Sequence, residues 1–386
     1  MPEQSEQSEQ ADILFTDEQG QLMEIAQTFS ANKSPIANVR QQMTAAGSIE
    51  ADLWAEIADL GWLGVAIPEE YGGSGLGLGE VVSIVEPMGR NLFASPLIST
   101  TLAAQVILAT GDAEQKSQWL PQLAGGTVAA LALSEAHGDW DLSNLTCTAT
   151  LVGDRLDLSG GKTFVTDAAM ADLFVVSVAL DGAPALILLE ASDLPSDALR
   201  QEIVIDETRR SYGMDLDGVS VSRDNLLRGG DIAASLKSLH LAACLLYAAE
   251  MCGGTVGVIN VTLEYLTTRR QFDHFIGAYQ ALKHPMVDAL TGLEAARSHL
   301  YHAATVFDFG GEPRDRGGRA EIAVRMAKAQ AADAFAFASD RAIQFHGAFG
   351  FTYECDAQLY RRRALWCEQQ HGDSQHHCKH LAPLLL

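Results

Sequence analysis

The chain has 386 residues, 47% of them hydrophobic and 20% charged, which is typical of a globular protein of two or three domains. Its formal net charge is −24, so it would repel nucleic acid and anionic membranes, which attract clustered Lys and Arg. No apolar run reaches the roughly 18 residues that a membrane helix needs, so we expect neither nucleic acid nor a membrane as a partner.

The first ten residues, MPEQSEQSEQ, are polar and of low complexity. They lack the basic and apolar segments of a signal peptide, so we predict a disordered tail over residues 1–10 and a cytoplasmic protein. Six scattered cysteines form no CxxC pair and are expected to be reduced and mostly buried.

Residues 11–125 are predicted to form an N-terminal α-helical domain. The stretches LFTDEQGQLMEIAQTF and IEADLWAEIADLGWLGV carry apolar residues at the i, i+3, i+4 spacing of amphipathic helices. A glycine-rich break, IPEEYGGSGLGLGE, separates them from another periodic run that ends near Leu108. Gly125-Gly126 marks the boundary.

Residues 126–232 are predicted to form a middle β domain, an antiparallel sheet or barrel. Short segments such as CTATLV, RLDLSG and LFVVSVAL often alternate and are rich in Val, Leu and Thr. Glycine-containing turns at Gly153-Asp154 and Gly160-Gly161 separate several of them, as in β-hairpins.

Residues 233–386 are predicted to return to helix and to form a C-terminal four-helix bundle. Long periodic segments run over 234–272, 284–309 and 319–345. A shorter one covers 358–367, and a last helix starts after Asp373. The fold class predicted from the pattern alone is therefore α+β multidomain, with helical, β and helical parts in that order.

Several stretches resemble the acyl-CoA dehydrogenase family, and they follow the same three-part order. GWLGVAIPEEYGGSGLG and KSQWLPQLAGGTVAALALSE are similar to the family's helical domain and its lead into the first strand. TRRQFDHFIGAYQALKHPMVD matches the pattern R-x-x-F, a Gln eight residues later and a His four further on. QFHGAFGFTYE matches Gln-x-x-Gly-x-x-Gly-aromatic, so the resemblance covers nearly the whole chain.

The resemblance implies a flavoprotein that holds FAD at a subunit boundary and desaturates an acyl-CoA thioester. In such an enzyme a carboxylate removes the α-proton, the flavin accepts the β-hydride, and an electron-transfer flavoprotein takes the electrons. The resemblance further implies that Arg269 pairs with the flavin diphosphate, that Phe272 and Gln280 line the adenosine side, and that these groups serve a neighbouring subunit's flavin. Gln344 and the Gly347 backbone would approach the same end. Alternatively, Arg269 closes a helix and Phe272 belongs to the core.

The stretch expected to face the flavin ring departs from the family pattern of Thr-Glu-Pro and a Gly-Ser-Asp turn. Here it reads Ser134-Glu135-Ala136-His137-Gly138-Asp139-Trp140-Asp141. The Ser134 hydroxyl and the Asp141 carboxylate are kept, but Trp140 replaces a serine and one glycine has become an aspartate. In the Lys-x-Trp-Ile-Thr pattern that follows, Phe164 stands for the tryptophan and Thr166 is retained.

The catalytic glutamate is missing from both places where the family carries it. The Glu-Gly-Thr-Ser-Gln loop reads His371-Gly372-Asp373-Ser374-Gln375 here, so His371 occupies the usual position. The alternative position, on the helix before Arg269, is Ala243, and Cys244 follows where an arginine usually binds CoA. A neutral imidazole at His371 could still accept a proton.

Two further interpretations of the C-terminal stretch are weighed. Glu368 or Asp373 could act as a displaced base, although a shift of one helical turn misplaces a carboxylate by several ångströms. His376 and His380 share a helix face and could bind a metal with Cys367, His371 or Cys378, but surface histidines on a solvated helix are the simpler explanation, and no metal site is predicted. The trio Arg361-Arg362-Arg363 is interpreted as a solvated or interface-pairing face.

Three hypotheses of function follow. In the first, the chain is a subunit lacking its own catalytic base in a heteromeric acyl-CoA dehydrogenase, a heterotetramer with a second family chain that carries the glutamate. Some two-chain members of the family act on CoA thioesters of bulky steroid side chains. In the second, the chain is a self-sufficient homo-oligomeric dehydrogenase that uses His371. In the third, it is a flavin-free binding or scaffold protein on the same fold.

Overall fold

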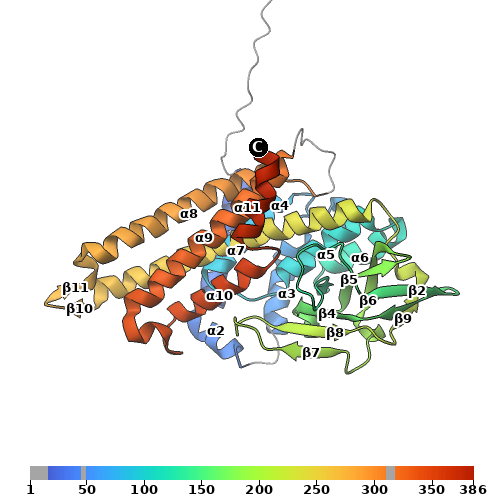
Figure 1. Cartoon of the computed structure of the whole chain (residues 1–386), viewed down its shortest axis with the longest axis horizontal. Helices are drawn as coiled ribbons and strands as arrows, with labels where there is room; N and C mark the ends of the chain where they lie inside the picture. Colours follow the sequence, from blue (N-terminus) through green and yellow to red (C-terminus); the bar gives the residue numbers. More distant parts are fainter. Residues whose placement is uncertain (1–15, 45–48, 310–317) are drawn as a thin grey trace, which may run out of the picture.

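The computed structural model describes residues 16–44, 49–309 and 318–386. The tail predicted over residues 1–10 lies outside these described residues. The chain forms an N-terminal group of helices, a middle region of strands and a C-terminal group of long helices (Figure 1). The strands lie at one end of the molecule, and the hairpin between the first two long helices lies at the other (Figure 1).

Among the described residues, six α-helices and two short 3-10 helices form the N-terminal part. In chain order they are α1 (Asp17–Lys33), α2 (Ile36–Gln42), α3 (Ala51–Asp59), η1 (Trp62–Gly64), η2 (Glu69–Tyr71), α4 (Leu78–Arg90), α5 (Leu97–Thr110) and α6 (Ala113–Ala124). Local sequence fixes where two of them begin. Thr16 and Asp112 each accept a hydrogen bond from the backbone of a glutamine three residues later, which is a capping box.

Two sheets make up the middle region. Its strands are β1 (Ala129–Ala132), β2 (Thr148–Val152), β3 (Arg155–Ser159), β4 (Gly161–Thr166), β5 (Leu173–Leu180), β6 (Ala183–Glu190), β7 (Leu199–Glu202), β8 (Ser211–Asp215) and β9 (Ser220–Ser222). One sheet has the order β1-β5-β2-β3-β9, with β6 also paired to β5, and the other has the order β4-β8-β7.

The prediction of an antiparallel sheet is confirmed for most strand pairs, but β5 pairs in parallel with both β1 and β2. The reason is topological. The chain makes long excursions between these strands, so each returns to its neighbour from the same direction, which a tight hairpin cannot do.

The C-terminal part contains the helices α7 (Ile232–Thr268), α8 (Gln280–Val306), α9 (Arg319–His346), α10 (Ala357–Gln369) and α11 (Ser374–Leu385). The hairpin β10 (Arg270–Gln271) and β11 (His274–Phe275) joins α7 to α8. The predicted helix over 234–272 therefore ends early. Phe272 and Asp273 both have positive φ, 52° and 63°, and form the hairpin turn instead.

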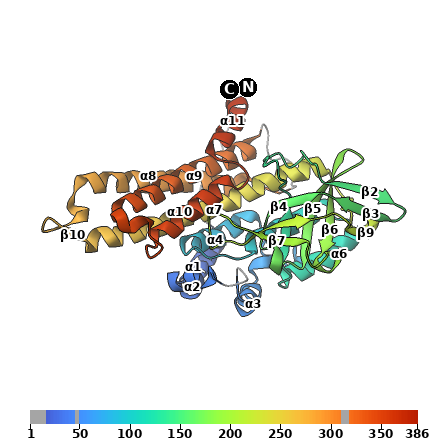
Figure 2. The same cartoon turned by 60° about the horizontal axis from the view of Figure 1, so that its bottom comes forward.

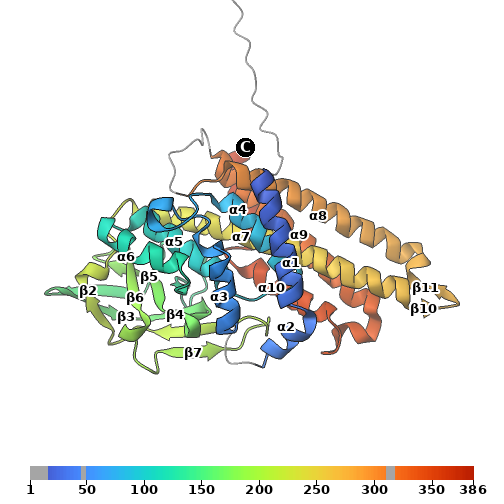
Figure 3. The same ribbon diagram turned by 180° about the vertical axis from the view of Figure 1, so that it is seen from behind.

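Helix α7 runs through the centre of the molecule. It is long and apolar enough to span a membrane, contrary to the expectation from the sequence, but 94% of its most apolar window is buried inside the protein. Helix α4 packs against it, and α1 packs on α4, on the face seen in Figure 3. Its glycines allow this approach, because a Cβ on Gly253 would lie 1.8 Å from the carbonyl oxygen of Glu86 in α4.

A buried ionic network joins the β region to α7 and α10. Arg363 of α10 donates to Asp206 and, at 2.6 Å, to Glu250 of α7, which also pairs with Arg209. The Arg363 side chain is 0% exposed. The interpretation of Arg361-Arg362-Arg363 as a solvated face is therefore wrong for Arg363, whose guanidinium pairs with two buried carboxylates.

Candidate functional site

The loop between α10 and α11 carries His371 and is held by one buried lysine. The Nζ of Lys328, in α9, donates to the carbonyl oxygens of Cys367 (3.2 Å), Glu368 (3.0 Å) and Gly372 (2.8 Å). His371 has a φ of +57°, a conformation that costs a non-glycine residue about 1 kcal/mol or more. The loop is thus fixed in a strained shape by three hydrogen bonds.

The two positions where the resemblance places a catalytic base lie next to each other. Cys244, which follows Ala243 in α7, contacts the His371 carbonyl oxygen through its sulfur at 3.5 Å. The His371 ring lies 6.0 Å from the Tyr247 ring, measured between centroids. Within the described residues, neither position provides a carboxylate. The resulting site contains a thiol, a phenol and an imidazole.

His371 is a weak base in this setting. Burial lowers its pKa from the ordinary 6.5 to about 4, and the positive charge of Lys328 acts in the same direction. The imidazole is therefore neutral at pH 7 but has a low affinity for a proton. A general base works best with a pKa near the operating pH, so His371 is poorly tuned for that role.

The alternative carboxylates from the same stretch do not face the cavities beside His371. Asp373 caps α11, where its Oδ1 accepts from the backbone N–H of His376 at 2.7 Å. Neither Asp373 nor Glu368 lines either cavity. Two other carboxylates do so, Asp139 and Asp167, both from the β region. Sequence reasoning did not select them because only the fold brings them to His371.

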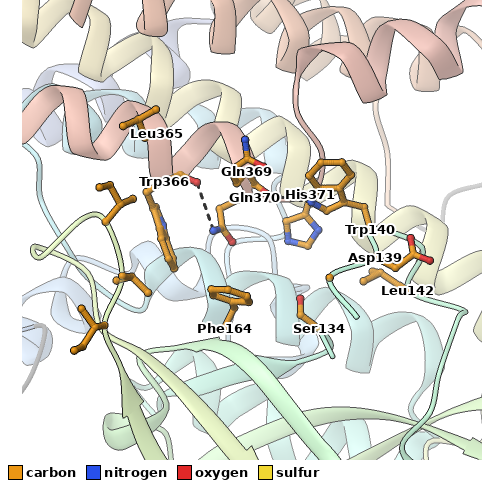
Figure 4. A pocket seen from close by; sticks show the side chains of 14 residues that line it. Ser134, Asp139, Trp140, Leu142, Phe164, Leu365, Trp366, Gln369, Gln370 and His371 are labelled. Carbon is orange, nitrogen blue, oxygen red and sulfur yellow. Dashed lines mark hydrogen bonds between the residues drawn. The ribbon is translucent and has the colours of Figure 1, made fainter. Parts of the chain in front are cut away.

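Two cavities meet at His371. The larger, of about 420 Å³, lies between the β region and α10, and its lining includes the aromatic side chains of Phe164, Trp366 and Trp140 (Figure 4). The smaller, of only about 50 Å³, lies between α5 and α7. Ser134 lines both cavities. Binding pockets for cofactors and substrates usually measure about 300–1,000 Å³, and only the larger cavity falls in this range.

A buried ion pair supports the Ser134 side of the larger cavity. Glu135 accepts from the Nζ of Lys162 in β4 at 2.7 Å and from the backbone N–H of Thr146 at 2.7 Å. Burial would raise the pKa of Glu135, but the hydrogen bonds from Lys162 and Thr146 outweigh it and lower the pKa to about 2. The Ser134 carbonyl also accepts from the Thr163 N–H at 2.9 Å. This segment is therefore tied firmly to β4.

Trp140 and Phe164, both departures from the family pattern, have defined positions. The indole N–H of Trp140 donates to the Gln369 carbonyl oxygen at 2.9 Å, which places the ring against the end of α10. Phe164 lies in a β-bulge of β4, has a φ of +55° and is half exposed. Thr166, farther along β4, lines the smaller cavity. The aromatic walls suit a flat, aromatic ligand ring.

The residues expected at the flavin tail lie together but far from these cavities. Arg269 ends α7, Phe272 lies in the β10–β11 turn, Gln280 begins α8, and Gln344 and Gly347 lie at the end of α9. All five are exposed, Phe272 to 84%. The hairpin end of the bundle lies opposite the β region (Figures 1 and 3). Within one chain the structure does not bring the tail residues to the ring residues.

The Arg269 guanidinium is available for a ligand. The Arg269 backbone N–H donates to the Tyr265 carbonyl oxygen at 2.9 Å and so closes α7, as the alternative interpretation expected. The Arg269 side chain has no hydrogen-bond or ion-pair partner among the residues that the structure describes, 16–44, 49–309 and 318–386. Phe272 does not belong to the core, so the alternative interpretation of that residue is wrong.

The sequence led us to expect surface histidines on α11, but the structure buries one of them. Helix α11 packs on α9 at the upper edge of the bundle (Figure 2), and His377 is 0% exposed. The His377 ring and the His376 ring both lie near the ring of His240 in α7. Cys378 is exposed, in contrast, and Cys367 is buried in α10. The correct neighbours could not be found by spacing because one of them lies on α7.

The three-part fold around an aromatic-walled cavity is that of the acyl-CoA dehydrogenases. A family model of the acyl-CoA dehydrogenase N-terminal domain matches residues 16–127, and one of the C-terminal domain matches residues 236–386. Acyl-CoA dehydrogenase FadE12 of Mycobacterium tuberculosis is 32% identical over 320 residues, which cover 79% of this chain and 80% of the relative. The chain belongs to the acyl-CoA dehydrogenase family.

Solved structures agree with this assignment, and two of them are named after two different proteins. The ChsE4-ChsE5 complex from Mycobacterium tuberculosis includes a chain with a TM-score of 0.85 and 25% identity, and the match covers 97% of this chain and 98% of that one. The Tcur3481-Tcur3483 steroid ACAD gives a TM-score of 0.83 and 28% identity, with coverage of 95% and 97%. The predicted family and fold class are thus confirmed.

FAD is the cofactor of this family, as the resemblance implied. The larger cavity fits the flavin ring in size and in the aromatic character of its walls. The exposed Arg269 fits a diphosphate in charge. The residues present therefore fit FAD, but at two separate places on the chain.

Proposed function

We propose that this chain is a subunit without its own catalytic base in a heteromeric FAD-dependent acyl-CoA dehydrogenase. It would contribute flavin-tail contacts and an interface, while a second chain of the family supplies the catalytic glutamate. The observation that carries the proposal is that neither position of the catalytic base holds a carboxylate. His371, a neutral imidazole with a pKa of about 4, stands where the family has a carboxylate, and its backbone carbonyl contacts the Cys244 thiol.

The size of the smaller cavity supports this role. A substrate whose α-carbon lay beside His371 would need its acyl chain in the apolar space lined by Ile98, Leu102 and Leu131. That space measures about 50 Å³ and is bordered by the bulky side chains of Tyr247 and Arg209. It is too small for an acyl group of more than a few atoms, so the substrate would be held by the other chain.

The difference between the two sets of flavin residues also supports it. In a homo-oligomer each chain needs both a ring site and a tail site. A chain paired with a complete partner needs only the tail site. Here the exposed set of Arg269, Phe272, Gln280 and Gln344 keeps the family pattern, whereas the stretch around Trp140 and His371 has changed.

In the proposed complex, the Arg269 side chain would bind the diphosphate, and Phe272 and Gln280 would flank the adenosine. Gln344 and the Gly347 backbone would approach the same end of the cofactor. When bound, FAD supplies a hydride acceptor for the β-carbon of the substrate. The residues of this chain would orient the cofactor and exclude water from its tail. The proton at the α-carbon would go to the partner's glutamate, and the electrons to an electron-transfer flavoprotein.

The substrate class is proposed from the two-chain neighbours. One of them is described as a steroid ACAD, and another is a complex of two differently named chains. We therefore propose a heterotetramer with two flavins per four chains that acts on a bulky, steroid-like acyl-CoA. This part depends on similarity and not on any pocket of this chain.

A second candidate is a self-sufficient dehydrogenase in which His371 is the base. The observation in its favour is the cavity of about 420 Å³, which this chain retains and which His371 lines. Replacement of His371 by alanine distinguishes the two candidates. Removing a general base costs about 10²- to 10⁴-fold in rate.

The experiment measures flavin reduction by acyl-CoA in the co-expressed complex, without oxygen. We expect the His371→Ala complex to be reduced at the wild-type rate, as should the control His302→Ala, which changes an exposed histidine of α8. A loss of 100-fold or more in the His371 variant alone would exclude the proposal and support the second candidate.

A further inference from the structure

A cluster of three histidines lies beside the candidate site and has no role in the proposed function. His240 comes from α7, and His376 and His377 are consecutive residues of α11. One side-chain nitrogen of each lies within 4.8 Å of the others. The ring centroids of His240 lie 6.2 Å from His376 and 6.1 Å from His377. The three imidazoles therefore converge on a common point.

The cluster is inside the protein yet can be reached from solvent. His240 is 8% exposed and His377 is 0% exposed. His240 and His376 line a cavity of about 610 Å³, and Glu321 and Asp139 provide carboxylates on its wall. A small ion could enter through this space, whereas a bulkier group would meet the Trp140 ring, 5.0 Å from that of His376.

One buried nitrogen of the cluster lacks an interaction partner among the described residues. The Nε2 of His240 is buried, and it has no hydrogen-bond partner in the part of the chain that the structure describes. An unsatisfied buried polar atom costs about 1–3 kcal/mol. A neutral imidazole nitrogen of this kind is either a donor without an acceptor or a lone pair without a donor or metal.

We propose that His240, His376 and His377 bind a divalent transition-metal ion such as Zn²⁺ or Co²⁺. Imidazole nitrogens are common ligands of these ions, while Mg²⁺ and Ca²⁺ prefer oxygen. Zn–N bonds of about 2.0–2.1 Å require the three nitrogens to move closer together than 4.8 Å, which rotation of the side chains can achieve. The ion would join α11 to α7 beside the His371 loop. The proposal does not depend on the proposed function, because it involves no flavin or partner chain.

Arg325 opposes the metal and provides a sharp test. Its Nη1 lies 3.3 Å from the Nδ1 of His377, and a guanidinium can only donate, so Nδ1 accepts and Nε2 carries the proton. Coordination through Nε2 would move that proton to Nδ1, opposite a donor. Coordination through Nδ1 would displace the guanidinium. Either way, Arg325 must release His377, and it retains Glu321, whose Oε1 lies 2.8 Å from its Nε.

The experiment titrates the metal-stripped, full-length chain with Co²⁺ and follows the visible bands of tetrahedral Co²⁺, with Zn²⁺ as competitor. We expect one ion per chain. His376→Ala should weaken Co²⁺ binding by more than about 100-fold. Substitution of residues that only support the ligands usually costs about 10- to 100-fold in metal affinity. Arg325→Met should tighten it, because a positive charge and a competing donor are removed. His302→Ala, on the exposed face of α8, should bind as the wild type does.

Circular dichroism of each variant controls for folding, and the half-buried His376 is chosen over the buried His240 for this reason. Absence of saturable one-to-one binding would overturn the proposal. So would a His376→Ala variant that folds and binds Co²⁺ with wild-type affinity. Weaker binding by Arg325→Met would contradict the role assigned to that residue and would likewise overturn the geometry proposed.

Discussion

The Lys162–Glu135 pair should make the β region sensitive to acid, and the size of the effect follows from the structure. Glu135 is held ionised by Lys162 and Thr146, with a pKa of about 2 in place of the ordinary 4.5. Because the folded-state pKa is lowered, the carboxylate stabilises the fold fully above pH 4.5 and loses that contribution as the pH falls toward 2. The gap corresponds to about 3 kcal/mol in total.

Glu135→Gln removes this titration. At pH 6 we expect the variant to be less stable than the wild type by about 3–5 kcal/mol, because Lys162 remains buried without its counter-ion. By pH 3.5 the wild type has lost about 1.4 kcal/mol of the Glu135 contribution, so the difference between the two proteins should shrink by that amount. Thr146→Val removes one of the hydrogen bonds to Glu135 and should reduce the pH-dependent part without abolishing it.

Urea unfolding, followed by tryptophan fluorescence at pH 6 and at pH 3.5, measures these differences. Equal losses of the free energy of unfolding between the two pH values, in the wild type and in Glu135→Gln, would contradict the ionised state of Glu135. That result would mean that Glu135 has a similar pKa in the folded and unfolded chain. The hydrogen bonds that tie Ser134 to β4 would then not depend on a charged carboxylate.

Three further predictions concern helix packing, the buried ionic network and the flavin tail. Gly253→Ala should destabilise the chain by more than about 2 kcal/mol in urea, whereas Gly292→Ala, where a Cβ meets nothing closer than 3.7 Å, should be neutral or stabilising by up to about 1 kcal/mol. Arg363→Met should lower the free energy of unfolding by about 3–5 kcal/mol, because it leaves the buried Asp206 without its ion-pair partner and Glu250 with Arg209 alone, and an unchanged urea midpoint would contradict this. Arg269→Ala should weaken FAD binding to the co-expressed complex by about 10- to 100-fold in equilibrium dialysis, and the neighbouring Arg270→Ala should not.

The order of helices and strands could be predicted from the sequence because it depends on local periodicity. The length and the Ala- and Leu-rich composition of the segment identified α7, apolar periodicity identified α9, and Asp373 marked the start of α11. Local periodicity could not predict which distant strands pair with each other. The parallel pairs of β5 with β1 and β2 arise from long-range topology, which no local pattern records.

The candidate site divides in the same way. Counting along the family motif led to His371 and to Ala243-Cys244, and the fold places these two positions in contact through Cys244. The effect of the fold on His371 could not be read from spacing, because its pKa is lowered by burial in the fold and further by Lys328, which lies on another helix and also fixes the loop. For the same reason the partnership of His240 with the α11 histidines was missed.

If this chain provides half of a flavin site, the ratio of FAD to protein must differ between the isolated chain and the complex. The ratio is measured for the chain purified alone and for the chain co-expressed with a family member that carries the catalytic glutamate. We expect a ratio near zero for the chain alone, rising to about one flavin per pair of chains in the complex. A ratio near one for the chain alone, with reduction of that flavin by an acyl-CoA, would contradict this expectation.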